Sequence, residues 1–391
     1  MKKLLIVLAM VACGASAYAM SFETAAGTID AYASVRGNLY YQSLTGMEQS
    51  ATVDKEDRNQ VMFGLQNNSR AGMKWAMGDV FAHYEVGFGD TAVNTRLFYA
   101  GYKADWGTLS FGRMASIAST DSFYNRKFNE DDGLAGYGTL VTTRREGIMY
   151  QNGGFQIALL SAVGDADRLN VAASAGDPAA TPPVAPVAGY EYSELIPRIE
   201  LAYTFPFDFP AKIFGSFAQV QYTTLTDGGD DMDLTAYHVG AVVKPQLTDS
   251  IYLTASAFYG VNAGAYGMAK VASYADSRSF VAGNATDDLL PAAAGDDFDD
   301  RTAFGGALAV GFKVNEQATV EAGFGYQANS SDVEGQDDKN SMGVYVNCGF
   351  KVTPQFTVTP EIAYLDSGDN FNGTTADGTA IQAGVQLRMD I

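Results

Sequence analysis

Long hydrophobic runs are scarce in this sequence. After Leu4–Ala12, no apolar stretch approaches the roughly twenty residues that a membrane-spanning helix needs. Cysteine is scarce too, and the loss of an N-terminal segment holding Cys13 would leave Cys348 without an intrachain disulfide partner. The two histidines, His83 and His238, stand beside no nucleophile elbow, and no cluster has metal-ligand spacing. We therefore expect no enzyme, no catalytic residue, no metal centre and no cofactor.

Basic side chains are in deficit. The 391 residues contain 25 Lys and Arg against 45 Asp and Glu, a formal net charge of -20. Nucleic acids are bound through phosphates that demand Lys and Arg, so we expect no nucleic-acid partner. With 47% hydrophobic and 12% aromatic residues, the chain is too apolar to be disordered. Its negative charge predicts a mild preference for cations at any pore mouth.

The N-terminal residues have the pattern of a secretory signal peptide. Lys2 and Lys3 precede the apolar run Leu4–Ala12, and Ala17-Tyr18-Ala19 supplies a small-x-small cleavage site. We expect residues 1–19 to be removed, leaving 20–391 as a single domain without an interdomain linker. A short buried helix and a lipoprotein site at Cys13 are the alternatives.

Alternation of apolar and polar residues is the strongest feature of the remaining chain. Over 380–391, the odd-numbered residues from Ile381 to Ile391 are apolar or small, and polar residues and glycine lie between them. A period of two indicates a strand, and about ten residues at that period cross a bilayer when tilted. The pattern recurs from Gly27 to Gln42 and is clearest in the last strands. An exported chain that enters lipid without helices must close into a barrel.

The connections alternate between short and long. Gly78-Asp79 and Asn315-Glu316 are tight turns, whereas 164–193 and 263–301 are long, and acidic or low in complexity. We predict an all-β, transmembrane antiparallel β-barrel of about 16 strands, with 18 as the alternative, short periplasmic turns and long outer loops. The last strand should pair with the Gly27 to Gln42 strand.

The loop at about 114–143 differs from the others because it combines aromatic and acidic residues. Before it stand Asn94–Lys103 and Gly107–Arg113, which resemble the fourth-to-fifth strand hairpin of the general, non-specific trimeric porins of the Gram-negative outer membrane. Ser69–Lys74 resembles the second strand of that family. The resemblance implies a homotrimer of water-filled barrels in the outer membrane, each with its third loop folded inward to narrow the pore.

In such porins, acidic residues of this loop face a ladder of arginines on the wall. Arg70 and Arg96 match two ladder positions, and the third should come from Arg144 or Arg145, of which parity favours Arg145. Arg36 is an additional inward base. The family's Pro-Glu-Phe-Gly-Gly motif is missing, so the loop acids are assigned only as a group: Asp121, Glu130, Asp131 and Asp132. Alternatively, the arginines pair with wall acids such as Glu85 and hold the barrel's shape.

The function implied is passive diffusion of small hydrophilic solutes and ions, filtered by size and charge at this constriction. A substrate-specific channel is one alternative. A structural or adhesive barrel is another, because the acidic outer loops could loosely bind divalent cations that bridge lipopolysaccharide phosphates. The expected partners are outer-membrane lipid, lipopolysaccharide, further copies of the chain and solutes. One departure is Ile391, since family members usually end in an aromatic residue.

Overall fold

The computed structural model describes residues 20–45, 57–89, 93–120, 123–128, 133–142, 144–162, 190–224, 232–266, 268–269, 300–331, 338–368 and 378–391. The predicted signal peptide, residues 1–19, lies outside these ranges. No helix in the described part of the chain is both long and apolar enough to cross a membrane.

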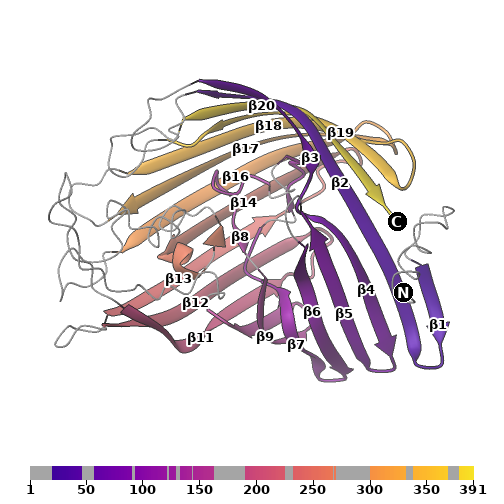
Figure 1. Ribbon diagram of the computed structural model, residues 1–391, viewed down its shortest axis with the longest axis vertical. Helices are drawn as coiled ribbons and strands as arrows, with labels where there is room; N and C mark the ends of the chain where they lie inside the picture. The colour runs from indigo at the N-terminus through magenta and orange to yellow at the C-terminus, as the bar shows by residue number, and fades with distance from the viewer. Residues whose placement is uncertain are drawn as a thin grey trace.

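Nearly all described residues belong to β-strands, which form one barrel wall (Figure 1). Two short strands, β8 and β15, pair only with each other. The strands are β1 (Met20–Thr24), β2 (Gly27–Thr45), β3 (Arg58–Leu65), β4 (Ser69–Met77), β5 (Val80–Phe88), β6 (Val93–Ala104), β7 (Gly107–Ala115), β8 (Val141–Thr142), β9 (Arg144–Asn152), β10 (Phe155–Leu160), β11 (Tyr190–Thr204), β12 (Ala211–Thr224), β13 (Met232–Val243), β14 (Ile251–Val261), β15 (Met268–Ala269), β16 (Arg301–Lys313), β17 (Ala318–Ser331), β18 (Lys339–Lys351), β19 (Phe356–Asp366) and β20 (Thr379–Asp390), with a 3-10 helix η2 (Ala263–Tyr266).

Antiparallel pairing closes the sheet into a ring. Each wall strand from β4 to β20 pairs with the next in chain order, and β2 pairs with β4 on one edge and with β20 on the other. Strands β3 and β4 are two segments of one barrel strand, because both pair with the same edge of β2. The ring therefore has sixteen positions, which confirms the predicted transmembrane barrel and excludes the eighteen-strand alternative.

The seam between the first and last strands forms as the sequence predicts. Leu39 pairs with Val385, and the register runs from Ser34 opposite Asp390 to Thr45 opposite Thr379. The Ile391 amide donates to the Ala33 carbonyl at 2.8 Å, and the Ala33 amide donates back to the Ile391 carbonyl at 2.7 Å. Ile391 thus continues the ladder although it is not aromatic. No open edge remains between β2 and β20 along this register.

Side chains alternate between lipid and lumen as expected. On β16, Phe304 and Leu308 are about half exposed on the outer face, whereas Ala303, Ala307 and Ala309 are buried inside. The same alternation runs along β17, β18 and β19. In a bilayer the outward apolar side chains meet acyl chains instead of water, so their exposure marks the lipid belt.

Two strands were not predicted. β1 folds back on β2, with Met20 opposite Ala31. β3 begins at Arg58, between the predicted Gly27 to Gln42 strand and the segment Ser69–Lys74. Its outward residues Val61 and Phe63 are apolar, but Met62 points inward and interrupts the alternation. β11 begins at Tyr190, inside the predicted long connection 164–193, and its register slips beside Ile196.

Candidate functional site: the channel lumen

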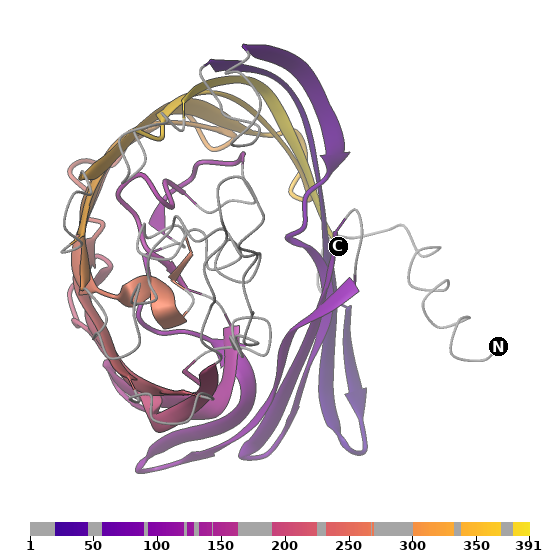
Figure 2. The same ribbon diagram turned by 60° about the vertical axis from the view of Figure 1, so that its left-hand side comes forward.

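The connection after β7 folds into the barrel. It leaves the sheet at Ser116 and meets it again at Arg144, and Figure 2 shows its described parts and helix η2 inside the ring of strands. Its hydrogen bonds reach strands from β11 to β20, so it lies along most of one side of the inner wall. β8, near the end of this loop, pairs with β15, so β15, which lies between β14 and β16 in the chain, is also inside the barrel.

Three buried wall glutamates hold this inward loop. Glu200 on β11 accepts the Ile117 amide at 2.9 Å. Glu321 on β17 accepts the Asn125 amide at 2.8 Å and its side-chain amide at 2.7 Å. The third glutamate is Glu361 on β19, and all three are at most 4% exposed. A loop that leaves its own sheet has unpaired amides, and buried carboxylates satisfy them through strong, charge-assisted bonds.

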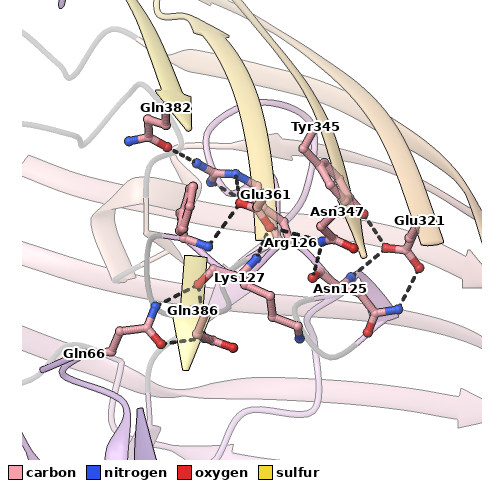
Figure 3. A network of polar contacts seen from close by, with 12 residues as sticks. Gln66, Asn125, Arg126, Lys127, Glu321, Tyr345, Asn347, Glu361, Gln382 and Gln386 are labelled. Carbon is pink, nitrogen blue, oxygen red and sulfur yellow. Dashed lines mark hydrogen bonds and ion pairs between the residues drawn. The ribbon is translucent and has the colours of Figure 1, made fainter. Parts of the chain in front are cut away.

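Glu361 on β19 contacts three consecutive loop residues (Figure 3). Its two oxygens accept the Lys127 amide at 2.6 Å and the Phe128 amide at 3.1 Å. The guanidinium of Arg126 lies 3.8 Å away, and both side chains are fully buried. Arg126 also donates to Gln382 on β20 at 2.9 Å. The loop residues 126–128 are therefore fixed to the wall by charge as well as by hydrogen bonds.

Wall cations bind the carbonyl groups of the same loop. Lys212 donates to the carbonyls of Ile117 and Ser119 at 3.2 and 2.8 Å, and Lys244 donates to that of Phe123 at 2.8 Å. His238, fully buried, lies 3.0 Å from the Ala118 carbonyl. Acids on the wall thus bind loop amides, and bases bind loop carbonyls.

Apolar packing completes the attachment. Loop residues Ile117, Ala118 and Leu140 join an inner cluster with Phe214 and Phe258 of the wall. Gly325 and Gly138 allow the closest approach. A Cβ at Gly325 would lie 2.0 Å from the Tyr137 carbonyl oxygen, and one at Gly138 would lie 2.2 Å from that of Gly306. At these positions the loop lies in direct contact with the wall, with no room for an added side chain.

The loop extends as far as the seam. The Phe128 ring stacks on Tyr40 of β2, with centroids 4.8 Å apart. Gln66, between β3 and β4, donates to the Lys127 carbonyl at 2.7 Å, and its own amide bonds to the carbonyl of Arg36. The strands from β4 to β9 lie beyond this point, and they carry most of the predicted arginine ladder.

The structure brings two of the predicted arginines together. Glu85 on β5 lies 2.7 Å from Arg96 and 3.5 Å from Arg70, and it also accepts the Tyr32 hydroxyl at 2.6 Å. Arg96 is 8% exposed and the Arg70 side chain 29%. Pairing with Glu85 is the arrangement that the alternative interpretation of the sequence described, and it leaves Arg70 facing open space.

A β-bulge aims Arg96 inward. Glu85 pairs with Leu97 and Val86 with Thr95, so Arg96 is the extra residue of its strand. Strict alternation from the exposed Phe98 would place Arg96 on the lipid face. The bulge shifts the alternation by one residue, as bulges commonly do where a side chain must be redirected.

The other predicted bases lie in different surroundings. Arg36 on β2 is 4% exposed, and its side chain donates to Ser34 at 3.1 Å. Arg145 on β9 is 5% exposed, and it is on the opposite face to the outward Ile148, as parity predicts. Arg144 is on the face of Ile148. The predicted loop acids, Asp121, Glu130, Asp131 and Asp132, lie outside the described residues.

Sequence reasoning missed the three anchoring glutamates. Alternation does place Glu321 and Glu361 on the lumen face, because their neighbours in β17 and β19 point outward. Their partners, however, are 196 and 234 positions away in the chain, and no local pattern indicates them. Both histidines point inward: His83 lies 2.8 Å from the Tyr32 hydroxyl, and His238 contacts the inward loop. In the described part of the chain no group of His, Cys, Asp and Glu could hold a metal ion.

Comparison with known proteins identifies the fold only through structure. No protein-family model matches the chain, and no curated protein matches its sequence. The outer membrane channel DcaP of Acinetobacter baumannii is 15% identical, with a TM-score of 0.65 over 95% of this chain and 99% of that one. OmpT of Vibrio cholerae, solved in a trimer form, is 16% identical, with a TM-score of 0.55 over 94% and 100%. An anion-selective porin from Comamonas acidovorans is 13% identical, with a TM-score of 0.53 over 93% and 99%. The chain therefore shares its β-barrel fold with these outer-membrane proteins.

Proposed function

We propose that this protein is an outer-membrane porin, a water-filled channel through which small hydrophilic solutes and ions diffuse passively. The observation that carries the proposal is the loop held inside the barrel by Glu200, Glu321 and Glu361. A barrel that served only as a scaffold would not need an internal loop fixed by buried charges. A channel needs one, because a fixed loop sets the width of the pore.

The selective region lies between the loop and the basic wall. Arg70, Arg96, Arg36 and Arg145 stand on the strands that follow the seam, and the loop is bound to the wall from β11 to β20. We assign the loop acids, Asp121 and the run Glu130–Asp132, to the side facing these arginines. Opposed charges across a narrow passage orient water and polar solutes, so the channel favours hydrophilic molecules over apolar ones.

Lipid, lipopolysaccharide and further copies of the chain are the proposed partners of the outer surface. The belt of exposed apolar side chains suits lipid. The trimer form of OmpT, which shares the fold, supports a homotrimer. The acidic outer loops would hold divalent cations loosely against lipopolysaccharide phosphates. No catalytic role is assigned to any residue.

Single-channel recording in planar lipid bilayers tests the proposal. Purified protein should insert with discrete conductance steps, and a trimer should close in three equal steps at high voltage. Arg96→Ala should enlarge each step, because a bulky side chain leaves the narrow region. Insertion into vesicles without any conductance step would refute the channel and favour a structural barrel.

A further inference from the structure

Two cavities open on the lumen wall near the end of the barrel that carries the short turns. One, of about 410 Å³, is lined by residues of β2, β4, β5 and β20, among them Arg70, Lys74 and Arg388. The other, of about 480 Å³, is lined by residues of β5, β6, β7 and β9, among them Phe81 and Lys103. Neither is needed for holding the loop, and each has the size of a small organic solute.

A row of four half-buried rings connects the cavities. Tyr32 lies 5.9 Å from His83, His83 lies 5.5 Å from Tyr99, and Tyr99 lies 6.4 Å from Phe81, measured between ring centroids. The His83–Tyr99 and Tyr99–Phe81 pairs pack edge to face, at interplanar angles of 67° and 84°, and the Tyr32–His83 pair is tilted at 60°. Tyr32 and His83 line the first cavity, and Tyr99 and Phe81 line the second. Aromatic edges and faces therefore border the open space along this row.

A lysine stands over each end of the row. The Lys74 ammonium lies 5.8 Å from the centroid of Tyr32, and the Lys103 ammonium lies 5.4 Å from that of Phe81. Among the described residues, no carboxylate lies within ion-pair distance of either lysine, although Asp30 is opposite Lys74 in register. These ammonium groups have aromatic contacts in place of anionic partners.

The acids that line the first cavity are already engaged. Glu85 accepts Arg96 and the Tyr32 hydroxyl, and Asp390 accepts Ser34 at 2.7 Å. Asp390 also pairs with Arg388 at 2.9 Å. Because these carboxylates are satisfied within the wall, the positive side chains rather than the acids remain available to a solute in the first cavity. In the second cavity, Lys103 shares the lining with Asp105.

We propose that this strip, defined as Tyr32, Lys74, Phe81, His83, Tyr99 and Lys103, binds aromatic carboxylates during their passage. A lysine binds the carboxylate, and the ring of the solute packs against the aromatic row in offset or edge-to-face contacts. At each end of the strip a lysine lies over a ring, so the wall offers a positive charge and an aromatic surface side by side. The inference rests on the proposed channel and names a class of solute for it.

Benzoate tests the proposal against two matched probes. Cyclohexanecarboxylate keeps the charge and approximate size but has no π face, and benzyl alcohol keeps the ring without the charge. We expect benzoate to interrupt single-channel current at concentrations about two- to tenfold lower than cyclohexanecarboxylate, the range typical of aromatic pairing. Benzyl alcohol should have no effect at the same concentrations.

Two variants locate the site. Lys74→Gln and Phe81→Leu should each raise the half-blocking benzoate concentration at least about threefold. Their controls are Arg113→Gln and Phe111→Leu on the outer face, where Phe111 is 60% exposed. A shift of gel mobility on heating shows whether each barrel has folded. Equilibrium dialysis of labelled benzoate against protein in detergent micelles gives a readout that does not depend on current.

The outcomes separate this inference from the channel itself. Conductance without a benzoate effect, or equal block by benzoate and cyclohexanecarboxylate, would overturn the aromatic site and leave the channel standing. Benzoate binding in dialysis that both lumen variants weaken would support the site even if no current were seen. Equal weakening by the outer-face controls would overturn it.

Discussion

The anchor at Glu361 offers the sharpest test of how the lumen is built. Glu361→Gln removes the negative charge beside the fully buried Arg126 and replaces one acceptor oxygen by a donor amide. That amide then opposes the amide of Lys127 or of Phe128. Removing one partner of a buried ion pair costs about 3–5 kcal/mol. Because the wall is held by strand pairing elsewhere, the cost should fall on the attachment of the loop.

Two basic residues of the loop allow its detachment from the wall to be measured by proteolysis. Arg126 and Lys127 are trypsin cleavage sites, and Arg126 is fully buried against the wall. When opening is fast relative to cleavage, the cleavage rate follows the population of the open loop. A loss of about 3–5 kcal/mol should accelerate cleavage there by a factor of about one hundred to several thousand. Mass spectrometry of the new ends would identify the site, and channel recordings should become noisier.

Two further variants control the experiment. Glu316→Gln removes the same charge at an exposed turn and should leave cleavage unchanged. Arg126→Gln combined with Glu361→Gln removes both charges, so it should open the loop less than Glu361→Gln alone. If Glu361→Gln behaved like Glu316→Gln, the buried ion pair would not hold the loop, and other contacts would have to fix residues 126–128 to the wall.

Three further predictions concern the arginine wall, the loop packing and the lipid belt. Arg96→Ala should move the reversal potential under a salt gradient toward cation preference, because it removes a positive charge from the lumen. Arg113→Ala, on the outer face, should leave the reversal potential unchanged. Equal shifts for the two variants would contradict the role of Arg96 in ion selection. Gly325→Ala should destabilise the packed loop by about 1–3 kcal/mol, because the added Cβ would lie 2.0 Å from the Tyr137 carbonyl oxygen. Gly37→Ala should change stability by less than about 0.5 kcal/mol, because its Cβ would lie 3.6 Å from the nearest atom. Thermal unfolding monitored by gel mobility would show whether the two variants differ. Leu308→Arg should cost about 2–4 kcal/mol if the residue lies near the bilayer midplane, and urea titration of folding into liposomes measures it.

Alternation of residue types predicted most of the wall. The outward-facing apolar residues of β16 to β20 and the pairing of β20 with β2 follow from a period of two. One face of each strand meets lipid, so a shift of the register by one residue would turn every side chain to the wrong face. The same rule fails at Arg96, where the bulge inserts one residue between Thr95 and Leu97. Resemblance to known porins, rather than alternation, pointed to Arg96.

The loop anchors could not be predicted for a different reason. Glu200, Glu321 and Glu361 lie far along the chain from the amides that they bind, and their positions in the lumen depend on closure of the whole barrel. From sequence they are inward acids of unknown purpose. The aromatic row is hidden in the same way, because its four rings come from three strands and meet only across the sheet.

The distribution of these charges decides what a solute meets. The chain is strongly acidic overall, yet Glu200, Glu321 and Glu361 bind loop amides and Glu85 binds Arg96. Lys74 and Lys103 have no carboxylate within ion-pair distance among the described residues. Charges in water act over about 8 Å at physiological ionic strength. In the channel that we propose, the acidic connections would therefore act on ions at the mouth, whereas the arginines and lysines of the wall would act on those inside. Net charge is consequently a poor guide to selectivity in this channel, and the preference among ions should change with salt concentration as the outer acids are screened.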